Sequence, residues 1–382
     1  MRNKTEIKPE KNIVIKRFRS RIARDKERYV LSVMDGSGLT PRLYDRSGCC
    51  LTMEYRPGQL ISDILYCPDT ALVTDVLKKL ADWLTDFRRY FYRQTGSHIV
   101  LEDINPRNFI YNHSTGRITG IDFESWHTGE KTENYISLLT MVKSAHSCDD
   151  DTSRAAYDRI FRYCGKFFTE NPENVEKTVD LSVQGALNRR KAMTAVRKTG
   201  CAILAGGKSS RMGSDKGMLP LGEYTFIDHI ICNAQIFDSM CISGDNPAYS
   251  CFGLPLVGDN YAGCGPLGAL QAVLTRAENT QVAVIPCDMP FVSQSTLLYL
   301  FSVASADADA VVFTAGDKAF PTVGIYRKTA LPVIEAQLTK GDFRLMHTLK
   351  LLNTQYVPAP HPHEFVNINT PRNYNEALNK GL

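Results

Sequence analysis

The stretch "LAGGKSSRMGSDK", Leu204 to Lys216, constrains the fold of this chain more than any other segment. It continues the short apolar run "CAILA", which is typical of a buried strand, so its two glycines stand at the carboxyl end of a strand. Glycine lets the backbone approach a ligand closely and offer N–H groups to it. The cations Lys208, Arg211 and Lys216, with the serine hydroxyls between them, predict a loop that binds phosphates.

Strand and helix signals alternate after this loop. The apolar runs "MCIS", "LPLVGD" and "VAVIPCD" are separated by helical stretches such as "TFIDHIICNAQIF" and "GPLGALQAVL". This alternation predicts βαβ units in an α/β fold with a doubly wound, mostly parallel, Rossmann-like sheet. Such sheets bind their ligands at the carboxyl ends of the strands, where the glycine loop is expected.

Two acidic residues stand near the ends of other predicted strands. Asp259 precedes a Gly-Pro-Leu-Gly turn that opens a helix, and Asp288 ends an apolar strand between two prolines. A carboxylate at the end of a buried strand packs poorly but suits a hard cation, so Asp288 is the candidate Mg2+ ligand and a candidate catalytic residue. Lys216 and Arg211 would stabilise the charge on the same phosphates as further catalytic residues.

These motifs, in this order, resemble those of the molybdenum cofactor guanylyltransferases, whose loop reads Leu-Ala-Gly-Gly-x-Ser-x-Arg-Met-Gly-x-Asp-Lys. The resemblance runs from residue 198 to the end and includes "VNINTPRN", with Asn367 and Asn369. It implies a GT-A-like nucleotidyltransferase that joins GMP from GTP to the terminal phosphate of molybdopterin, with Mg2+, and releases pyrophosphate. The residues that the resemblance implies as nucleotide contacts are Leu204, Ala205, Gly206, Gly207, Lys216, Asp245, Asp259 and Asp288.

Two details of this resemblance leave alternatives open. Where the family usually carries an asparagine after the second strand, this chain offers Asp245 or Asn246. The related cytidylyltransferases tend to have Ala-Ala-Gly in the first loop and to lack the Gly-Pro-Leu turn, so Leu204 and residues 265–267 favour guanine. CTP-dependent cytidylyl transfer and nucleotidyl transfer to a sugar phosphate remain the alternatives.

The first half of the chain carries a different constellation. In "VLEDINPRNFIYN" and "RITGIDFE", Asp103 stands five residues before Asn108, and Asp122 precedes Phe123. The spacing resembles the catalytic and metal-binding loops of the protein-kinase-like fold, and its variants resemble the aminoglycoside or choline phosphotransferases. The resemblance implies that Asp103 accepts a hydroxyl proton as a catalytic residue and that Asn108 and Asp122 hold Mg2+ on ATP.

Upstream residues fit the same constellation. Lys16 in "IVIKRF" would be the strand lysine and Glu27 its helix partner, both at a nucleotide site. The fifteen residues before Lys16 contain no glycine, so the glycine-rich loop is missing. We therefore expect an α+β kinase-like fold with a shortened amino lobe. It is either an active small-molecule kinase or a degenerate fold that acts as an adaptor in molybdoenzyme maturation.

The length of 382 residues accommodates two domains, which we place at 1–197 (kinase-like) and 198–382 (nucleotidyltransferase). Apolar residues recur every three or four positions between Asp69 and Gly96, which predicts a long amphipathic helix capped by Asp69 or Thr70. The segment from 153 to about 198 is also expected to be helical.

Composition excludes several classes of protein. The formal net charge of +4 is too small and dispersed for a nucleic-acid partner. No run of about 18 apolar residues is present, so no membrane span is expected. Eleven cysteines without a Cys-x-x-Cys pair indicate neither a disulfide framework nor a zinc site, and favour the cytoplasm. The expected partners are molybdopterin and, in the adaptor alternative, a molybdoenzyme or a cofactor-insertion protein.

Overall fold

The computed structural model describes residues 4–45, 48–145, 151–206 and 215–379. The chain divides into two compact units between Asn188 and Arg189, inside helix α6 (Pro172–Val196). The predicted domain limit after residue 197 lies just beyond the end of this helix. Among the described residues, none of the helices combines the length and the apolar character needed to span a bilayer.

The N-terminal unit opens with a four-stranded antiparallel sheet in the order β1-β2-β4-β3. Helix α1 (Arg21–Val33) follows β2, and its first turn is capped by Ser20, whose hydroxyl accepts the Ala23 N–H at 3.2 Å. In the sheet register Lys16 lies opposite Leu51. The strands are β1 (Lys4–Lys8), β2 (Ile13–Arg17), β3 (Leu43–Asp45) and β4 (Cys50–Glu54).

The rest of this unit is mostly helical. Helix α3 (Thr70–Thr95) confirms the predicted long helix: the Asp69 carboxylate accepts the N–H groups of Ala71 and Leu72, and Gly96 ends it with φ 72°. The other helices are α2 (Ile61–Ile64), α4 (Lys131–Ala145), α5 (Asp151–Cys164) and α6. The short strands are β5 (Gln59–Leu60), β6 (Ile99–Leu101), β7 (Phe109–Asn112), β8 (Arg117–Gly120) and β9 (Trp126–Thr128).

An aromatic core on helix α3 anchors the segment that contains Asp122. Phe123, the next residue, is 2% exposed and stacks on Phe87 with their ring centroids 5.5 Å apart. Phe87 stacks in turn on Trp83 of the same helix, at 4.8 Å. Buried aromatic contacts of this kind hold a loop in one conformation, so Asp122 is carried by the core although it is itself part-exposed.

The C-terminal unit is built on a seven-stranded sheet in the order β14-β13-β10-β15-β17-β16-β18. Strand β17 is antiparallel to both of its neighbours and the other pairings are parallel, so the predicted mostly parallel α/β sheet is confirmed. The strands are β10 (Thr199–Leu204), β13 (Ser239–Ser243), β14 (Leu256–Val257), β15 (Gln281–Pro286), β16 (Ala310–Ala315), β17 (Lys318–Arg327) and β18 (Thr354–Pro358).

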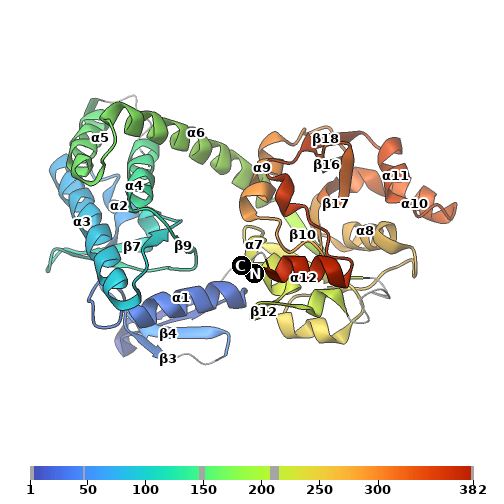
Figure 1. Ribbon diagram of the computed structural model, residues 1–382, viewed down its shortest axis with the longest axis horizontal. Coiled ribbons are helices and arrows are strands. Elements are labelled where there is room, and N and C mark those ends of the chain that lie inside the picture. The colour runs from blue at the N-terminus through green and yellow to red at the C-terminus, as the bar shows by residue number, and fades with distance from the viewer. Residues whose placement is uncertain (1–3, 46–47, 146–150, 207–214, 380–382) are drawn as a thin grey trace. The chain divides into compact units, whose positions relative to one another are not determined.

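Helices cover both faces of this sheet (Figure 1). Alternate residues of β10 point to opposite cores: Cys201 and Ile203 pack with α7 and α9, whereas Ala202 and Leu204 pack with α8, α10 and α11. The helices are α7 (Phe226–Asn233), α8 (Gly265–Arg276), α9 (Gln294–Val303), α10 (Leu331–Thr339), α11 (Leu345–Leu351) and α12 (Pro371–Asn379).

Candidate active site

Three neighbouring parallel strands end at one edge of the C-terminal sheet. Leu204 of β10 lies opposite both Ser243 of β13 and Pro286 of β15. Beyond the strand end, the Ala205 N–H donates to the carbonyl of Ser243 at 2.8 Å, which continues the pairing. The fold thus brings to this edge the predicted contacts Leu204, Ala205, Gly206, Asp245 and Asp288.

Lys216 and Asp288 meet at this edge although 72 residues separate them. The Lys216 Nζ lies 3.4 Å from Asp288 Oδ2 and also donates to Asn369 Oδ1. Burial raises the pKa of the Asp288 carboxyl above its ordinary value, while the charge of Lys216 opposes this shift. The Ile368 N–H donates to the Asp288 carbonyl at 2.9 Å. A largely buried cation and carboxylate therefore stand side by side at the strand ends.

Asp245 and Asp259 lie together at the same end of the sheet. Burial raises the pKa of the Asp259 carboxyl above its ordinary value, and the nearby charge of Asp245 adds to the shift. Asp259 follows β14, the neighbour of β13, with only Gly258 between. A Cβ on Gly258 would come within 2.5 Å of Asp245 Oδ1, so any other residue there would displace the Asp245 carboxylate.

Asp215, directly before Lys216, accepts hydrogen bonds that were not predicted from the sequence. Its Oδ2 accepts Asn246 Nδ2 at 2.7 Å, and its Oδ1 accepts the Gly217 N–H at 2.9 Å. The hydroxyl of the fully buried Tyr249 also contacts Asp215 Oδ1 and lies 3.1 Å from the Ala205 carbonyl oxygen. Local sequence gave no signal for Tyr249, because its partners lie 34 and 44 residues away.

Of the two candidates for the family asparagine, only Asn246 contacts Asp215, whereas Asp245 faces Asp259 and Gly258. Two other predicted site residues, Gly207 and Arg211, lie outside the described residues. The functions assigned to all of these side chains from the sequence stay predictions.

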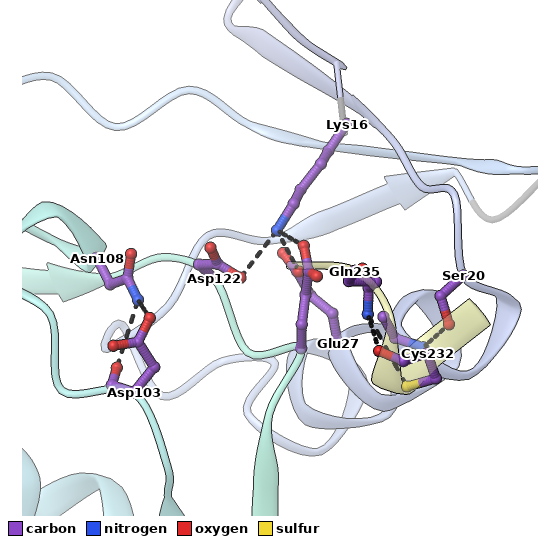
Figure 2. A network of polar contacts seen from close by, with 10 residues as sticks. Lys16, Ser20, Glu27, Asp103, Asn108, Asp122, Cys232 and Gln235 are labelled. Atoms are coloured by element: carbon purple, nitrogen blue, oxygen red, sulfur yellow. Dashed lines mark hydrogen bonds and ion pairs between the residues drawn. The ribbon is translucent and has the colours of Figure 1, made fainter. Parts of the chain in front are cut away.

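In the N-terminal unit the structure gathers the residues predicted around Lys16 (Figure 2). The Lys16 Nζ lies 2.6 Å from Glu27 Oε2 and 3.0 Å from Asp122 Oδ1, a residue 106 positions later in the chain. A third carboxylate, that of Glu124, lies 2.7 Å away. Glu124 was not predicted as a site residue. The sequence could have indicated it, because it is the glutamate of the "Asp-Phe-Glu" variant.

Burial and charge oppose each other at this cluster. Burial acts to lower the pKa of Lys16, but attraction to Glu27, Asp122 and Glu124 outweighs it and raises that pKa above its ordinary value. Burial raises the pKa of Glu27 to about 7, although Lys16 opposes the shift. The three carboxylates thus favour the charged form of Lys16, whereas burial favours the protonated form of Glu27.

Asp103 and Asn108 form a second pair in this unit (Figure 2). The Asn108 Nδ2 donates to Asp103 Oδ2 at 3.3 Å, and the Ile121 N–H donates to the Asn108 carbonyl at 2.7 Å. This bond brings the loop of Asn108 next to Asp122, whose φ of 78° lies in the left-handed region. Aspartate tolerates that region better than most residues, and such strain is concentrated at functional sites.

One carboxylate oxygen each of Glu27, Asp122 and Glu124 lies within 4.8 Å of the other two, a spacing that could accommodate a metal ion. In this arrangement Lys16 contacts all three of them. A single ammonium among three carboxylates leaves an excess of negative charge. An anionic polyphosphate would therefore enter more readily together with a divalent cation.

The mostly parallel sheet, with Gly206 at the end of β10 and Lys216 paired with Asp288, is the arrangement expected of an α/β nucleotidyltransferase. A family model described as a MobA-like NTP transferase domain matches residues 201–355. A "Probable molybdenum cofactor guanylyltransferase" of Carboxydothermus hydrogenoformans is 34% identical over 185 residues, which cover 46% of this chain and 93% of that protein. By this similarity, the chain belongs to the molybdenum cofactor guanylyltransferase family.

Two further proteins match a similar share of the chain. The molybdenum cofactor guanylyltransferase of Vibrio parahaemolyticus is 34% identical over 179 residues, 46% of this chain and 92% of that protein. The crystal structure of molybdopterin-guanine dinucleotide biosynthesis protein A from Archaeoglobus fulgidus is 23% identical, covers 48% of this chain and 98% of that chain, and has a TM-score of 0.44. Each of these similarities spans about half of the chain.

Proposed function

We propose that the C-terminal unit transfers GMP from GTP to the terminal phosphate of molybdopterin and releases pyrophosphate. The observation that carries this proposal is the contact of Lys216 with Asp288 at the sheet edge, in a chain that covers 93% of a relative named as a guanylyltransferase. Lys216 would bind the phosphate oxygens of GTP and stabilise the charge that develops as pyrophosphate leaves. The acceptor phosphate is already an anion, so positioning by the site would replace a general base.

The residues around Asp288 fit a Mg2+ ion. Asp288 supplies an anionic oxygen, and Oδ1 of Asn367 is buried without a hydrogen-bond partner among the described residues. Asn367 directly precedes Ile368, and the Ile368 N–H donates to the backbone carbonyl of Asp288. This hydrogen bond joins the turn that carries the Asp288 carboxylate to the turn that carries Asn367 Oδ1. When bound there, Mg2+ would neutralise phosphate charge during the transfer.

The test is incubation of the full chain with Mg2+, labelled GTP and molybdopterin, followed by measurement of pyrophosphate release. Release with GTP and not with CTP supports guanylyl transfer. Release with CTP alone would make the protein a cytidylyltransferase. Release with neither on molybdopterin, but with a phosphorylated sugar as acceptor, would make it a sugar-phosphate nucleotidyltransferase.

A second function is favoured by the polar cluster of the N-terminal unit. We propose that the N-terminal unit is a kinase-like domain that binds ATP with Mg2+ and transfers a phosphoryl group. Support comes from the contacts of Lys16 with Glu27 and Asp122, and from the pairing of Asp103 with Asn108. Asp103 would accept the acceptor's hydroxyl proton, and Asn108 and Asp122 would hold the cation.

This second proposal competes with a non-catalytic function as an adaptor. The measurement is ATP turnover by the full chain and by its Asp103→Asn and Asp122→Asn variants. Turnover that both substitutions abolish supports phosphoryl transfer. Absence of turnover, together with nucleotide-independent binding of a molybdoenzyme or a cofactor-insertion protein, would make the unit an adaptor.

A further inference from the structure

Tyr249 is a fully buried tyrosine whose hydroxyl contacts two acceptors, one at the end of strand β10 and one directly before Lys216. It lies 3.1 Å from the carbonyl oxygen of Ala205, the first residue beyond β10, and against Oδ1 of Asp215. A phenol that is removed from water this completely needs a hydrogen-bond partner, and both of these atoms are acceptors. The side chain thus joins the end of strand β10 to the residue that precedes Lys216.

Asp215, which Tyr249 contacts, also fixes the backbone around Lys216. Its carboxylate accepts the N–H of Gly217 at 2.9 Å and thereby caps the short helical turn Lys216–Met218. The Asn246 amide holds its other oxygen at 2.7 Å. Because both flanking residues are fixed in this way, the backbone of Lys216 has one orientation, with its Nζ between Asp288 and Asn369.

The Tyr249 side chain is tightly packed against the turn that follows Lys216. A Cβ on Gly217 would come within 3.0 Å of the Tyr249 hydroxyl and 2.7 Å of Ile227. Burial, and then the hydrogen bond to Asp215, raise the pKa of Tyr249 above its ordinary value, so the hydroxyl remains a donor at neutral pH. Its single proton goes to the carboxylate in preference to the carbonyl, because a charged acceptor binds it more strongly.

We propose that Tyr249 is a positioning residue for nucleotidyl transfer: through Asp215, its hydroxyl holds the ammonium of Lys216 against Asp288 before the triphosphate arrives. Such preorganisation matters because a cation that is already aligned needs no rearrangement when charge develops on the phosphates. The proposal rests on the proposed guanylyl transfer for its kinetic consequence. Its structural part concerns Lys216 alone.

The test compares Tyr249→Phe with Tyr326→Phe, each of which deletes a hydroxyl and leaves the ring. Tyr326 is the matched control, because it is also fully buried in the C-terminal unit and donates to the Pro321 carbonyl at 2.6 Å. We expect Tyr249→Phe to lower kcat/KM for GTP roughly five- to tenfold, less than the full effect of one hydrogen bond to a charged group, because Asp215 keeps its bonds to Asn246 and Gly217. Tyr326→Phe should lower the unfolding midpoint similarly and leave kcat/KM unchanged.

A second readout does not depend on turnover. Lys216 is acetylated with a limiting reagent, and its labelling rate is measured by peptide mass spectrometry. The rate should rise about fivefold in Tyr249→Phe and stay unchanged in Tyr326→Phe. Asp215→Asn should show the same rise, and the double variant Tyr249→Phe/Asp215→Asn should be no worse than Asp215→Asn, since both act through one contact.

The outcomes separate this proposal from the function on which it rests. Wild-type protein that releases no pyrophosphate would refute guanylyl transfer, while the labelling of Lys216 would still decide whether Tyr249 holds it. Active wild-type protein with unchanged kcat/KM and unchanged labelling in Tyr249→Phe would overturn the positioning role. Equal kinetic losses in Tyr249→Phe and Tyr326→Phe would also overturn it, because they would show a loss of stability only.

Discussion

Asp288 is the residue whose substitution tests the proposed transfer chemistry most directly. We expect Asp288→Asn to lower pyrophosphate release roughly a hundredfold or more, because the amide carries no charge for a cation. The unfolding midpoint should not fall, since burial of Asp288 raises its pKa and so disfavours the charged form in the folded protein. Steady-state kinetics and thermal unfolding check the two parts.

Asp317→Asn is the control for this substitution, since Asp317 is exposed in the turn between β16 and β17. It should change neither quantity. Near-normal turnover by the Asp288→Asn variant would remove this residue from the metal site.

Glu27 gives the N-terminal unit a predictable pH dependence. Its pKa is raised to about 7 by burial, so between about pH 4.5 and pH 7 the folded state holds a proton that the unfolded state has lost. Protonated Glu27 therefore stabilises the folded state. This contribution is fully present below the pKa of the unfolded state and disappears as the pH rises to about 7. Relative to Glu27→Gln, the wild-type protein should lose about 1 kcal/mol of unfolding free energy per pH unit in this window.

Tryptophan fluorescence during urea unfolding measures this, since both tryptophans of the chain, Trp83 and Trp126, belong to the N-terminal unit. The Glu27→Gln variant is its own control, because every other titrating group is common to the two proteins. A difference between them that does not change between pH 5 and pH 7 would show that Glu27 is ionised throughout.

At the residue scale, the sequence indicates a side chain when the residue itself belongs to a recognisable motif. Lys216 and Asp288 could be predicted because each stands beside a recognisable strand or loop. Tyr249 could not, because it belongs to no motif and only the folded sheet brings it to Asp215. The choice between Asp245 and Asn246 also needed the fold, which shows Asn246 bound to Asp215. Glu124 was visible as a variant residue, but only the fold shows that it contacts Lys16.

Among the elements, helix α3 is the most completely specified by local sequence. Its apolar spacing and both of its ends are local features, and all of them could be predicted. The order of the strands is different in kind: β15 inserts beside β10, and the antiparallel β17 separates β15 from β16. That order depends on which apolar faces meet in the two cores, and no window of sequence contains this information.

The capping of helix α3 predicts a measurable stability effect. Asp69→Ala removes an acceptor for the N–H groups of both Ala71 and Leu72, so the N-terminal unit should lose about 1 kcal/mol of stability. Tryptophan fluorescence in urea measures the change. Asp75→Ala on the same helix is the control, since Asp75 is exposed and forms a surface ion pair with Lys79, and it should cost less than half as much.

For the whole molecule, the end of helix α6 belongs to the C-terminal unit. Ala192 and Val196 are 2% and 0% exposed and pack into the core that also contains Cys201 and Ile203. A C-terminal fragment that starts at residue 189 should therefore be more stable than one that starts at 198, by about 2 kcal/mol. Thermal unfolding of the two fragments tests this, and equal midpoints would show that the helix end contributes nothing.

During synthesis, strand β10 is made well before one of the two strands that pair with it. One of its neighbours, β13, follows within the next forty-odd residues, but Thr199 and its partner Gln281 on β15 are 82 residues apart. At about 5–20 residues per second, translation leaves that edge of β10 without a partner for roughly 4–16 s. An open edge with apolar side chains can pair with other chains, so this interval is when a growing polypeptide most needs a chaperone. A run of slowly translated codons between the two strands would lengthen that exposure and lower the yield of soluble protein.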